Sequence, residues 1–239
     1  MKFDDDPVKQ DSQLRFAAYV TQLDTKVGEL IAALEATGQR SNTLIVFTSD
    51  NGGLLGGRNP YVGKVADSPV LSSNLPLRGH KNTLYEGGGR VSAFANWPGQ
   101  LAPRKLAAPL HAADWMPTLT KLAGWQPPAD LKFDGLDVWP LLTGAVEKPA
   151  SRAIYIPHPS GAIVLRDGWK LISRKRASKG SPALELFNVT ADPFEKKDLA
   201  PAEPQRVKEL QGILAALRAG DLKEMPKDAG DGAVDQADK

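Results

Sequence analysis

The feature that most constrains the fold is a long apolar stripe followed closely by a short apolar run. The stripe recurs at three- and four-residue steps, as on one face of an amphipathic α-helix, and Gly38 after it suits a left-handed helix end. Its members are Phe16, Val20, Leu23, Val27, Leu30, Ile31 and Leu34. Residues 43–48 (TLIVFT) are β-branched or apolar throughout, which is typical of a strand buried on both faces of a parallel sheet. Helix, short loop and buried strand are half of an α/β repeat, so the sequence predicts an α/β fold.

The rest of the first predicted domain, residues 1–145, is organised around a long loop. Residues 52–79 are rich in Gly, Pro, Ser and Asn and show no periodicity, and loops of that length in compact domains are usually functional or mobile. We expect a second strand at residues 91–97. A further helix is expected to begin at Asp114, a good N-cap, and to end before Gly124.

A small C-terminal α+β subdomain is predicted at residues 146–220. Short apolar runs indicate strands, and they are separated by Ser160-Gly161 and by Asp167-Gly168, the latter a good signal for a two-residue hairpin. The runs lie at residues 153–156, 162–166, 169–173 and 184–187. A final amphipathic helix places on one face Val207, Leu210, Ile213, Leu214 and Leu217. Residues 221–239 carry too little apolar surface for an ordered fold, so we expect a disordered tail there.

Composition and charge exclude several classes of protein. The 239 residues contain no cysteine, which excludes disulfides, cysteine-ligated zinc and a cysteine nucleophile. The net charge is +2 and the basic residues form no long run, so no nucleic-acid partner is expected; residues 170–179 are interpreted as a strand with a solvated face. No apolar stretch approaches the roughly 18 residues of a membrane span. The polar, acidic start is not a signal peptide, so the chain as written is expected to be cytoplasmic.

The most informative segment, Ser49-Asp50-Asn51-Gly52-Gly53, directly follows the predicted buried strand. In open α/β sheets ligands bind beyond the carboxyl ends of the strands. A carboxylate and an amide oxygen side by side there suit a hard cation such as calcium or magnesium. The alternative is an ordinary turn, because Asp, Asn and Gly dominate turns for conformational reasons.

A second segment concentrates cationic side chains in a Gly-rich stretch. Arg78, His80, Lys81 and Arg90 lie within thirteen positions. A tetrahedral oxyanion ester needs such donors, because charge on its oxygens must be stabilised as the leaving group departs. The alternative is a solvated basic loop in which one arginine pairs with Glu86.

Taken together, these segments resemble the type I sulfatases, and the arylsulfatase B-like branch most of all. The sequences that carry the resemblance are SDNGG, NLPLRGHKNTLYEGGGR, HAADWMPTLTKLAG, FDGLDVWPLLTG, WKLI and ELFNVTADPFEKKDLA. They run in the family's order from about Tyr19 to Ala200. The resemblance implies part of an alkaline-phosphatase/sulfatase-like sheet with flanking helices, followed by a small antiparallel sheet and a helix.

The resemblance also implies roles for individual residues. Asp50 and Asn51 match the family's pair that ligates a divalent cation, usually Ca²⁺, with Mg²⁺ or Zn²⁺ as alternatives. Lys81 matches the lysine that contacts the sulfate group, so it is a candidate catalytic and substrate-binding residue. His80 has no inherited role and is a candidate for both tasks from its place beside Lys81, and Arg78 is a candidate for substrate binding.

Four further residues are expected to have no direct part in the chemistry. In the family Glu86 and Arg90 look structural, since they fix the loop that carries the lysine. His111 and His158 are expected to be packed or surface histidines.

The family's nucleophile has no counterpart in this sequence. In the family, a Cys or Ser within Cys/Ser-x-Pro-x-Arg becomes formylglycine, whereas this chain has no Cys and no Ser in that motif. The resemblance therefore implies the C-terminal half of a sulfatase, on which the usual mechanism cannot run alone. Asp4, Asp5 and Asp6 are not expected to replace the family's N-terminal metal ligands, because they lie in a polar leader.

Four functional hypotheses remain open at this point. The chain is part of a sulfuric ester hydrolase, a free-standing hydrolase of phosphate or sulfate esters using cation-activated water, a non-catalytic binding module for sulfate or other anions, or an inactive fragment. Because the family's sheet draws strands from the other half, unpaired edges and apolar faces are expected to favour a homo-oligomer, a separately encoded N-terminal half or marginal stability.

Overall fold

The computed structural model describes residues 7–54, 72–174 and 183–221, in two compact units. The first unit contains Met1–Arg152 and Asn188–Lys197, and the second contains Ala153–Phe187 and Asp198–Lys239. Apart from Asp221, the predicted disordered tail lies outside the described residues, as does most of the predicted long loop. In the part of the chain that is described, no helix is long and apolar enough to cross a membrane.

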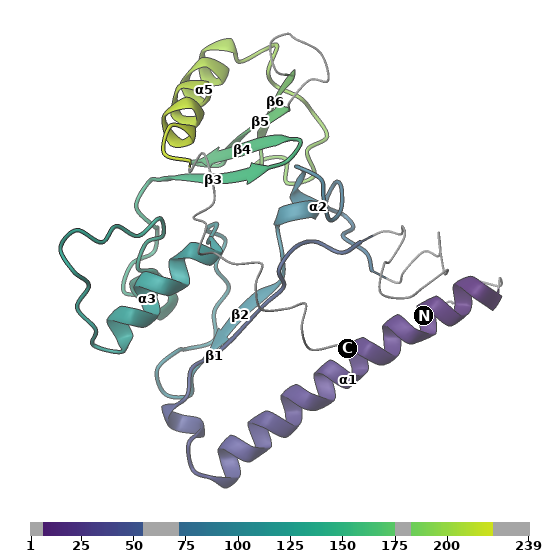
Figure 1. The fold of residues 1–239 in the computed structure, drawn as a ribbon, viewed down its shortest axis with the longest axis vertical. Coiled ribbons are helices and arrows are strands. Elements are labelled where there is room, and N and C mark those ends of the chain that lie inside the picture. The colour runs from purple at the N-terminus through teal and green to yellow at the C-terminus, as the bar shows by residue number, and fades with distance from the viewer. Residues whose placement is uncertain (1–6, 55–71, 175–182, 222–239) are drawn as a thin grey trace, which may run out of the picture. The chain divides into compact units, whose positions relative to one another are not determined.

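The first unit contains short strands and helices that follow one long helix (Figure 1). Its elements are α1 (Pro7–Ala36), η1 (Arg40–Asn42), β1 (Ile45–Thr48), α2 (Glu86–Gly89), β2 (Ala93–Asn96), η2 (Ala112–Asp114), α3 (Trp115–Leu122) and α4 (Trp139–Thr143). The predicted end of α1 is confirmed: Gly38 has φ +69°, and the Gln39 N–H donates to the Leu34 carbonyl at 2.9 Å. This bond back across the last turn is the one expected when a left-handed residue ends a helix.

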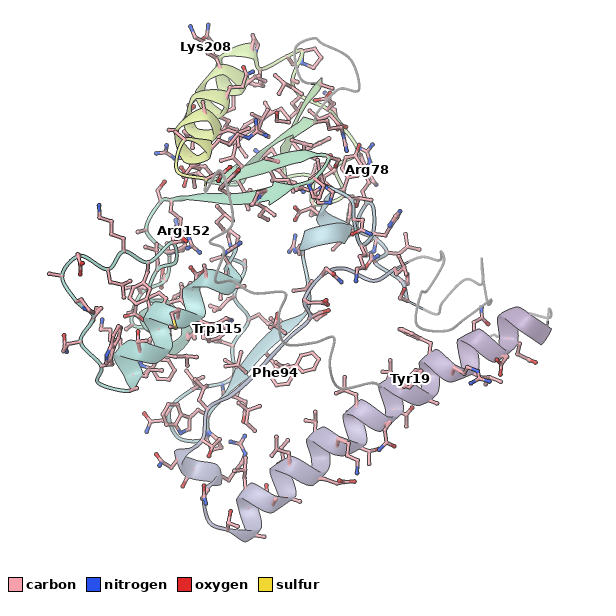
Figure 2. The ribbon with its side chains drawn as sticks, viewed as in Figure 1. Tyr19, Arg78, Phe94, Trp115, Arg152 and Lys208 are labelled. Carbon is pink, nitrogen blue, oxygen red and sulfur yellow. The ribbon has the colours of Figure 1, made fainter. Side chains whose placement is uncertain are left out.

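Strands β1 and β2 form an antiparallel pair, with Phe47 opposite Phe94. The two rings stack with centroids 5.2 Å apart, and Phe94, labelled in Figure 2, remains 51% exposed. The expectation of a parallel strand buried on both faces is therefore wrong for β1, whose residues are half-buried or exposed. The apolar run indicates that both faces can be buried, but strand direction depends on the partner, which the run does not encode.

Asp114 organises the region around α3. Its carboxylate is 1% exposed and accepts hydrogen bonds from the His111 N–H at 2.7 Å, from the Leu136 N–H at 3.0 Å and from the Arg152 guanidinium. Asp114 is the N-cap residue of α3, as the sequence predicts, but its side chain makes no capping hydrogen bond to that helix. It instead completes a capping box on η2, in which Asp114 is the third helical residue and its side chain accepts from the N–H of the N-cap, His111.

The electrostatics of Asp114 follow from these contacts. Burial alone would raise the pKa of the carboxyl group, but the hydrogen bonds from Arg152, His111 and Leu136 outweigh it and lower the pKa below its ordinary value of 3.8. The ionised form is therefore the one that stabilises the fold.

The second unit is a four-stranded antiparallel sheet covered on one face by a helix (Figure 1). Its elements, in the order of the sheet, are β3 (Ala153–His158), β4 (Gly161–Arg166), β5 (Trp169–Arg174) and β6 (Ala183–Asn188), with α5 (Pro204–Arg218) packed against them. The shared core consists of Ala162, Val164, Leu171, Leu186, Leu210 and Leu214. The predicted strands and the apolar face of the final helix are confirmed, with ends shifted by one to two residues.

The two hairpin turns differ in how well the sequence predicts them. Asp167 and Gly168 have φ +51° and +81°, the pair of positive values that a type I′ turn requires, and Arg166 pairs with Trp169 across it. In the other hairpin Gly161 already belongs to β4 and pairs with His158, so the turn lies one residue earlier than predicted.

The interpretation of residues 170–179 as a strand with a solvated face is wrong where the structure describes them. Lys170, opposite Leu165 in the sheet, is only 2% exposed, and Ser173 is 3% exposed. Alternation of basic and apolar residues predicts that one face of the strand is exposed to solvent. In the structure, however, β5 is buried on both faces at Lys170–Ser173. Residues 175–179 lie outside the described ranges.

We predict that Asp114→Asn lowers the free energy of unfolding by about 3 kcal/mol at neutral pH, because it leaves the Arg152 charge half-buried without its counter-ion. Urea unfolding measures this loss, with the exposed Asp130→Asn as the control, expected within about 0.5 kcal/mol of the parent chain.

The same comparison across pH tests the sign of the effect. Since the folded pKa of Asp114 lies below its ordinary value of 3.8, its stabilisation is complete above that value and is lost as pH falls through the folded pKa. The stability gap between the parent chain and Asp114→Asn should therefore narrow in acid. A gap that is unchanged by acid, or absent at neutral pH, contradicts this account.

Candidate functional site

Strand β1 ends in a tight turn that carries Asp50 and Asn51. The Asp50 carboxylate accepts from the Asn51 N–H at 2.9 Å, and the Ser49 hydroxyl donates to the Asn51 carbonyl at 2.9 Å. Asp50 is exposed and Asn51 is half-buried. These local hydrogen bonds stabilise the turn and leave the Asp50 side chain accessible from solvent. Both predicted metal ligands therefore lie at the carboxyl end of the strand, where a cation from solvent can reach Asp50.

Backbone hydrogen bonds join this turn to the segment that contains Lys81. The Gly52 N–H donates to the Gly88 carbonyl at 3.0 Å, and the Lys81 N–H donates to the Gly53 carbonyl at 3.1 Å. Asn74 reinforces the contact, since its side chain accepts from the Gly53 N–H at 2.7 Å and donates to the Gly53 carbonyl at 2.8 Å. The two segments that the sequence singles out are thus brought together.

Glycine is required where these two segments meet. A Cβ on Gly52 would overlap the Gly87 carbonyl oxygen, and a Cβ on Gly87 would overlap the carbonyl oxygens of Arg78 and Gly79. A Cβ on Gly88 would overlap the carbonyl oxygen of Thr83. Because backbone contacts backbone directly, the segments approach more closely than any side chain would allow.

The turn at His80–Thr83 holds Lys81 in place. The His80 Nδ1 lies 2.7 Å from the Lys81 carbonyl oxygen, and since that oxygen can only accept, the ring nitrogen is the donor. The Thr83 hydroxyl donates to the His80 carbonyl at 2.7 Å and accepts from the His80 N–H at 3.0 Å. Asn82 has φ +68°, so the chain reverses directly after Lys81.

Arg78 and Arg90 are both engaged with neighbouring side chains. The Arg78 guanidinium lies 3.7 Å from the centre of the Tyr85 ring, and it donates to the Tyr85 hydroxyl at 2.9 Å and to the Glu195 carbonyl at 3.1 Å. Arg90 lies 3.7 Å from the Glu86 carboxylate, and its exposed side chain makes this ion pair weak. Figure 2 labels Arg78.

Glu195 is a buried residue of this site that sequence reasoning missed. It is 0% exposed, and its carboxylate accepts from the Glu86 N–H at 2.7 Å, at the first residue of α2. The sequence carries only an indirect signal, the Asp-Pro-x-Glu element within ELFNVTADPFEKKDLA. No local pattern links that element to a loop more than a hundred residues earlier.

His111 and His158 take part in local turns. The His111 Nδ1 accepts from the Ala113 N–H at 3.2 Å, and the His158 Nδ1 accepts from the Ser160 N–H at 3.1 Å. Within the described ranges, no group of three or more His, Cys, Asp or Glu side chains is placed to hold a metal. The metal-binding role of Asp50 and Asn51, and the sulfate-contacting role of Lys81, therefore stay predictions.

Residues 3–125 match the family described as Sulfatase. The chain belongs to the sulfatase family. It is 32% identical to mouse (Mus musculus) steryl-sulfatase over 233 residues, which cover 84% of this chain and 36% of that enzyme.

Solved structures show the same fold. Ps i-CgsB in complex with k-i-k-neocarrahexaose matches with a TM-score of 0.68 and 29% identity, over 83% of this chain and 41% of that one. BT4656 in complex with its substrate D-glucosamine-2-N,6-O-disulfate matches with a TM-score of 0.57 and 23% identity, over 84% and 39%, and indicates fold alone. The expected α/β fold of the alkaline-phosphatase-like sulfatases is confirmed, and the chain spans about two fifths of the length of these relatives.

We predict that Gly87→Ala disrupts the site whereas Gly89→Ala, two residues on in α2, does not. An added methyl meets two carbonyl oxygens at Gly87 but nothing within 4 Å at Gly89. Overpacking of this kind costs about 1–3 kcal/mol, whereas the open position should be neutral or gain up to about 1 kcal/mol.

Urea unfolding and hydrogen exchange of the Gly52 amide measure both variants. Faster exchange is expected in Gly87→Ala only. Equal exchange in the two variants would show that the close backbone contact does not exist in solution.

Proposed function

We propose that this sulfatase-family chain supplies the cation-contacting and sulfate-contacting side chains of a site that hydrolyses sulfuric esters. The observation that carries the proposal is the backbone connection of Gly52 and Gly53 to Gly88 and Lys81, with N···O distances of 3.0 and 3.1 Å. It holds the turn of Asp50 and Asn51 beside the loop of Lys81.

Asp50 and Asn51 fit a hard divalent cation as two of its ligands. Members of the family generally use a divalent cation. The pair offers one ionised carboxylate and one amide oxygen, the donors that calcium prefers, but calcium takes six to eight oxygens, so other groups must complete the shell. When bound, the cation would supply positive charge to the ester oxygens.

The chain's own cationic groups account for recognition of the sulfate. On this proposal the Lys81 ammonium donates to a sulfate oxygen and stabilises charge that develops as the ester bond breaks. His80 presents its second ring nitrogen from the neighbouring position, because Nδ1 already donates to the Lys81 carbonyl. Arg78 adds positive charge from its fixed place on Tyr85.

The nucleophile is proposed to come from outside residues 1–239. The sequence contains no Cys and no Ser in Ser-x-Pro-x-Arg, so formylglycine cannot form within it. We propose sulfated carbohydrates and aryl sulfates as the substrate class. Support comes from Ps i-CgsB, which is 29% identical to this chain and has been solved in complex with k-i-k-neocarrahexaose.

Calorimetric titration tests the two assigned contacts. We expect Asp50→Ala to weaken Ca²⁺ binding by about tenfold or more, because it removes the only charged ligand of the pair. In saturating Ca²⁺, Lys81→Ala should weaken aryl sulfate binding by about 10- to 100-fold, the usual effect of losing a hydrogen bond to a charged group. Exposed Asp130→Ala and Lys208→Ala are the matched controls. Unchanged affinities in both site variants would contradict the proposal.

Turnover assays separate this proposal from a free-standing hydrolase. The parent chain and both site variants are assayed on an aryl sulfate, an aryl phosphate and a phosphotriester with Ca²⁺, Mg²⁺ or Zn²⁺. On our proposal the parent chain binds the aryl sulfate without turning it over. Turnover that requires both the cation and Lys81 would instead favour activated water as the nucleophile.

We further propose that exposed apolar residues of α1 are covered by another segment of the sulfatase fold. Tyr19 is 75% exposed, and Leu30, Leu23 and Val20, which lie on the same side of the helix at about 100° per residue, are 56%, 53% and 51% exposed. An exposed apolar stripe of this kind is typical of an interface. The chain spans 36% of mouse steryl-sulfatase and 41% of Ps i-CgsB, so each of those proteins has segments without a counterpart in this chain.

We predict that the isolated chain is not a stable, monodisperse monomer, since its apolar stripe favours self-association. Size-exclusion chromatography with light scattering gives the mass, and Leu23→Lys with Leu30→Lys should reduce any self-association. A monodisperse monomer with a cooperative, stable unfolding transition would contradict this part of the proposal.

A further inference from the structure

The segment Asn188–Lys197 belongs to the same compact unit as β1 and α2, although it follows β6 in the chain. It is built as a series of side-chain-capped turns. The Asn188 side chain accepts from the Thr190 and Ala191 N–H groups, and the Asp192 carboxylate accepts from the Lys196 N–H at 2.7 Å. Glu195, with φ +53°, lies at the centre of the last turn. These bonds fix the backbone at Glu195, whose side chain is fully buried.

Glu195 contacts both ends of the loop that carries His80 and Lys81. Its carbonyl accepts from the Arg78 guanidinium at 3.1 Å, and its carboxylate accepts from the Glu86 N–H at 2.7 Å. The Gly87 N–H also donates to the Arg78 carbonyl at 2.7 Å, which closes the loop at its base. One buried residue from more than a hundred positions away therefore spans the two ends of the loop.

A buried carboxylate is a costly choice for a purely structural contact. Desolvation disfavours the charged form unless hydrogen bonds and nearby positive charge compensate. The Glu86 N–H supplies one such bond. This bond, 2.7 Å from the Glu86 nitrogen to the Glu195 Oε2, fixes the first residue of α2 and with it one end of the loop.

We propose that Glu195 is a positioning residue that holds the Arg78–Glu86 loop so that Lys81 and His80 stay beside Asp50 and Asn51. The effect on sulfate affinity rests on the proposed function, whereas the clamp, meaning the hydrogen bonds of Glu195 with Arg78 and Glu86, does not. The inference gives the segment Asn188–Lys197 the role of setting the affinity for the sulfate group without contacting it.

Two shape-conserving variants isolate the acceptor oxygen. Glu195→Gln keeps an oxygen that can accept from the Glu86 N–H, whereas Glu195→Met has similar length and no such oxygen. The exposed Glu147→Met is the control. Three quantities are measured on folded protein: hydrogen exchange of the Glu86, Gly87 and Lys81 amides, affinity for Ca²⁺, and affinity for an aryl sulfate in saturating Ca²⁺.

We expect Glu195→Met to speed exchange of the three amides at least tenfold and to weaken aryl sulfate binding about tenfold, the order of effect of losing one buried hydrogen bond. Ca²⁺ affinity should change less than about twofold, because Asp50 and Asn51 lie on the β1 turn. Glu195→Gln should retain aryl sulfate affinity within about threefold. This separation of sulfate from Ca²⁺ affinity is what a general loss of structure would not produce.

Several results would overturn the inference. These are Glu195→Met exchanging and binding like the parent chain, Ca²⁺ and sulfate affinities falling together, or Glu195→Gln losing as much sulfate affinity as Glu195→Met. If Glu195→Met does not fold, Glu195→Asp, which withdraws the carboxylate from Glu86 while keeping its charge, takes its place with the same expectations. If the parent chain binds no aryl sulfate, the proposed function fails, and the exchange data alone then decide whether the clamp exists.

Discussion

The site depends on one constraint, the direct approach of two backbone segments at glycine positions. A Cβ on Gly52 would overlap the Gly87 carbonyl oxygen, and the Gly52 N–H donates to the Gly88 carbonyl. This approach is close because Gly52 carries no side chain. It fixes the turn of Asp50 and Asn51 against the loop of Lys81. The candidate cation- and sulfate-contacting side chains are therefore positioned by glycines that have no side chain.

Buried carboxylates extend this arrangement to distant parts of the chain. The Asp114 carboxylate accepts hydrogen bonds from the backbone N–H groups of His111 and Leu136 and forms an ion pair with Arg152. The Glu195 carboxylate accepts a hydrogen bond from the Glu86 N–H. For Asp114 the cost of burying the carboxylate is offset by the hydrogen bonds from His111, Leu136 and Arg152. Both carboxylates therefore connect loops that no sheet or long helix holds together.

The sequence predicts best those features whose cause is local. The end of α1 at Gly38 and the hairpin at Asp167-Gly168 require positive φ, which few residues adopt, and the apolar face of α5 has a helical period. Features that depend on a distant partner are not predictable in this way. The antiparallel pairing of β1, the burial of Lys170 and the clamp of Glu195 each involve a contact that local periodicity does not encode. The candidate site lies between these cases. Local residue types favour a plain turn over a metal site, and only the resemblance of several motifs in order favours the metal site.

The central claim is that the Asp50–Asn51 turn and the Lys81 loop form one cation-centred site. Paramagnetic broadening of amide NMR signals by Mn²⁺ tests it most directly, because broadening depends on distance from the bound ion. The account predicts that low Mn²⁺ concentrations broaden the amides of Asn51, Gly53 and Lys81 together, and that Asp50→Ala abolishes this. Broadening that spares Lys81, or that persists in Asp50→Ala, would contradict it.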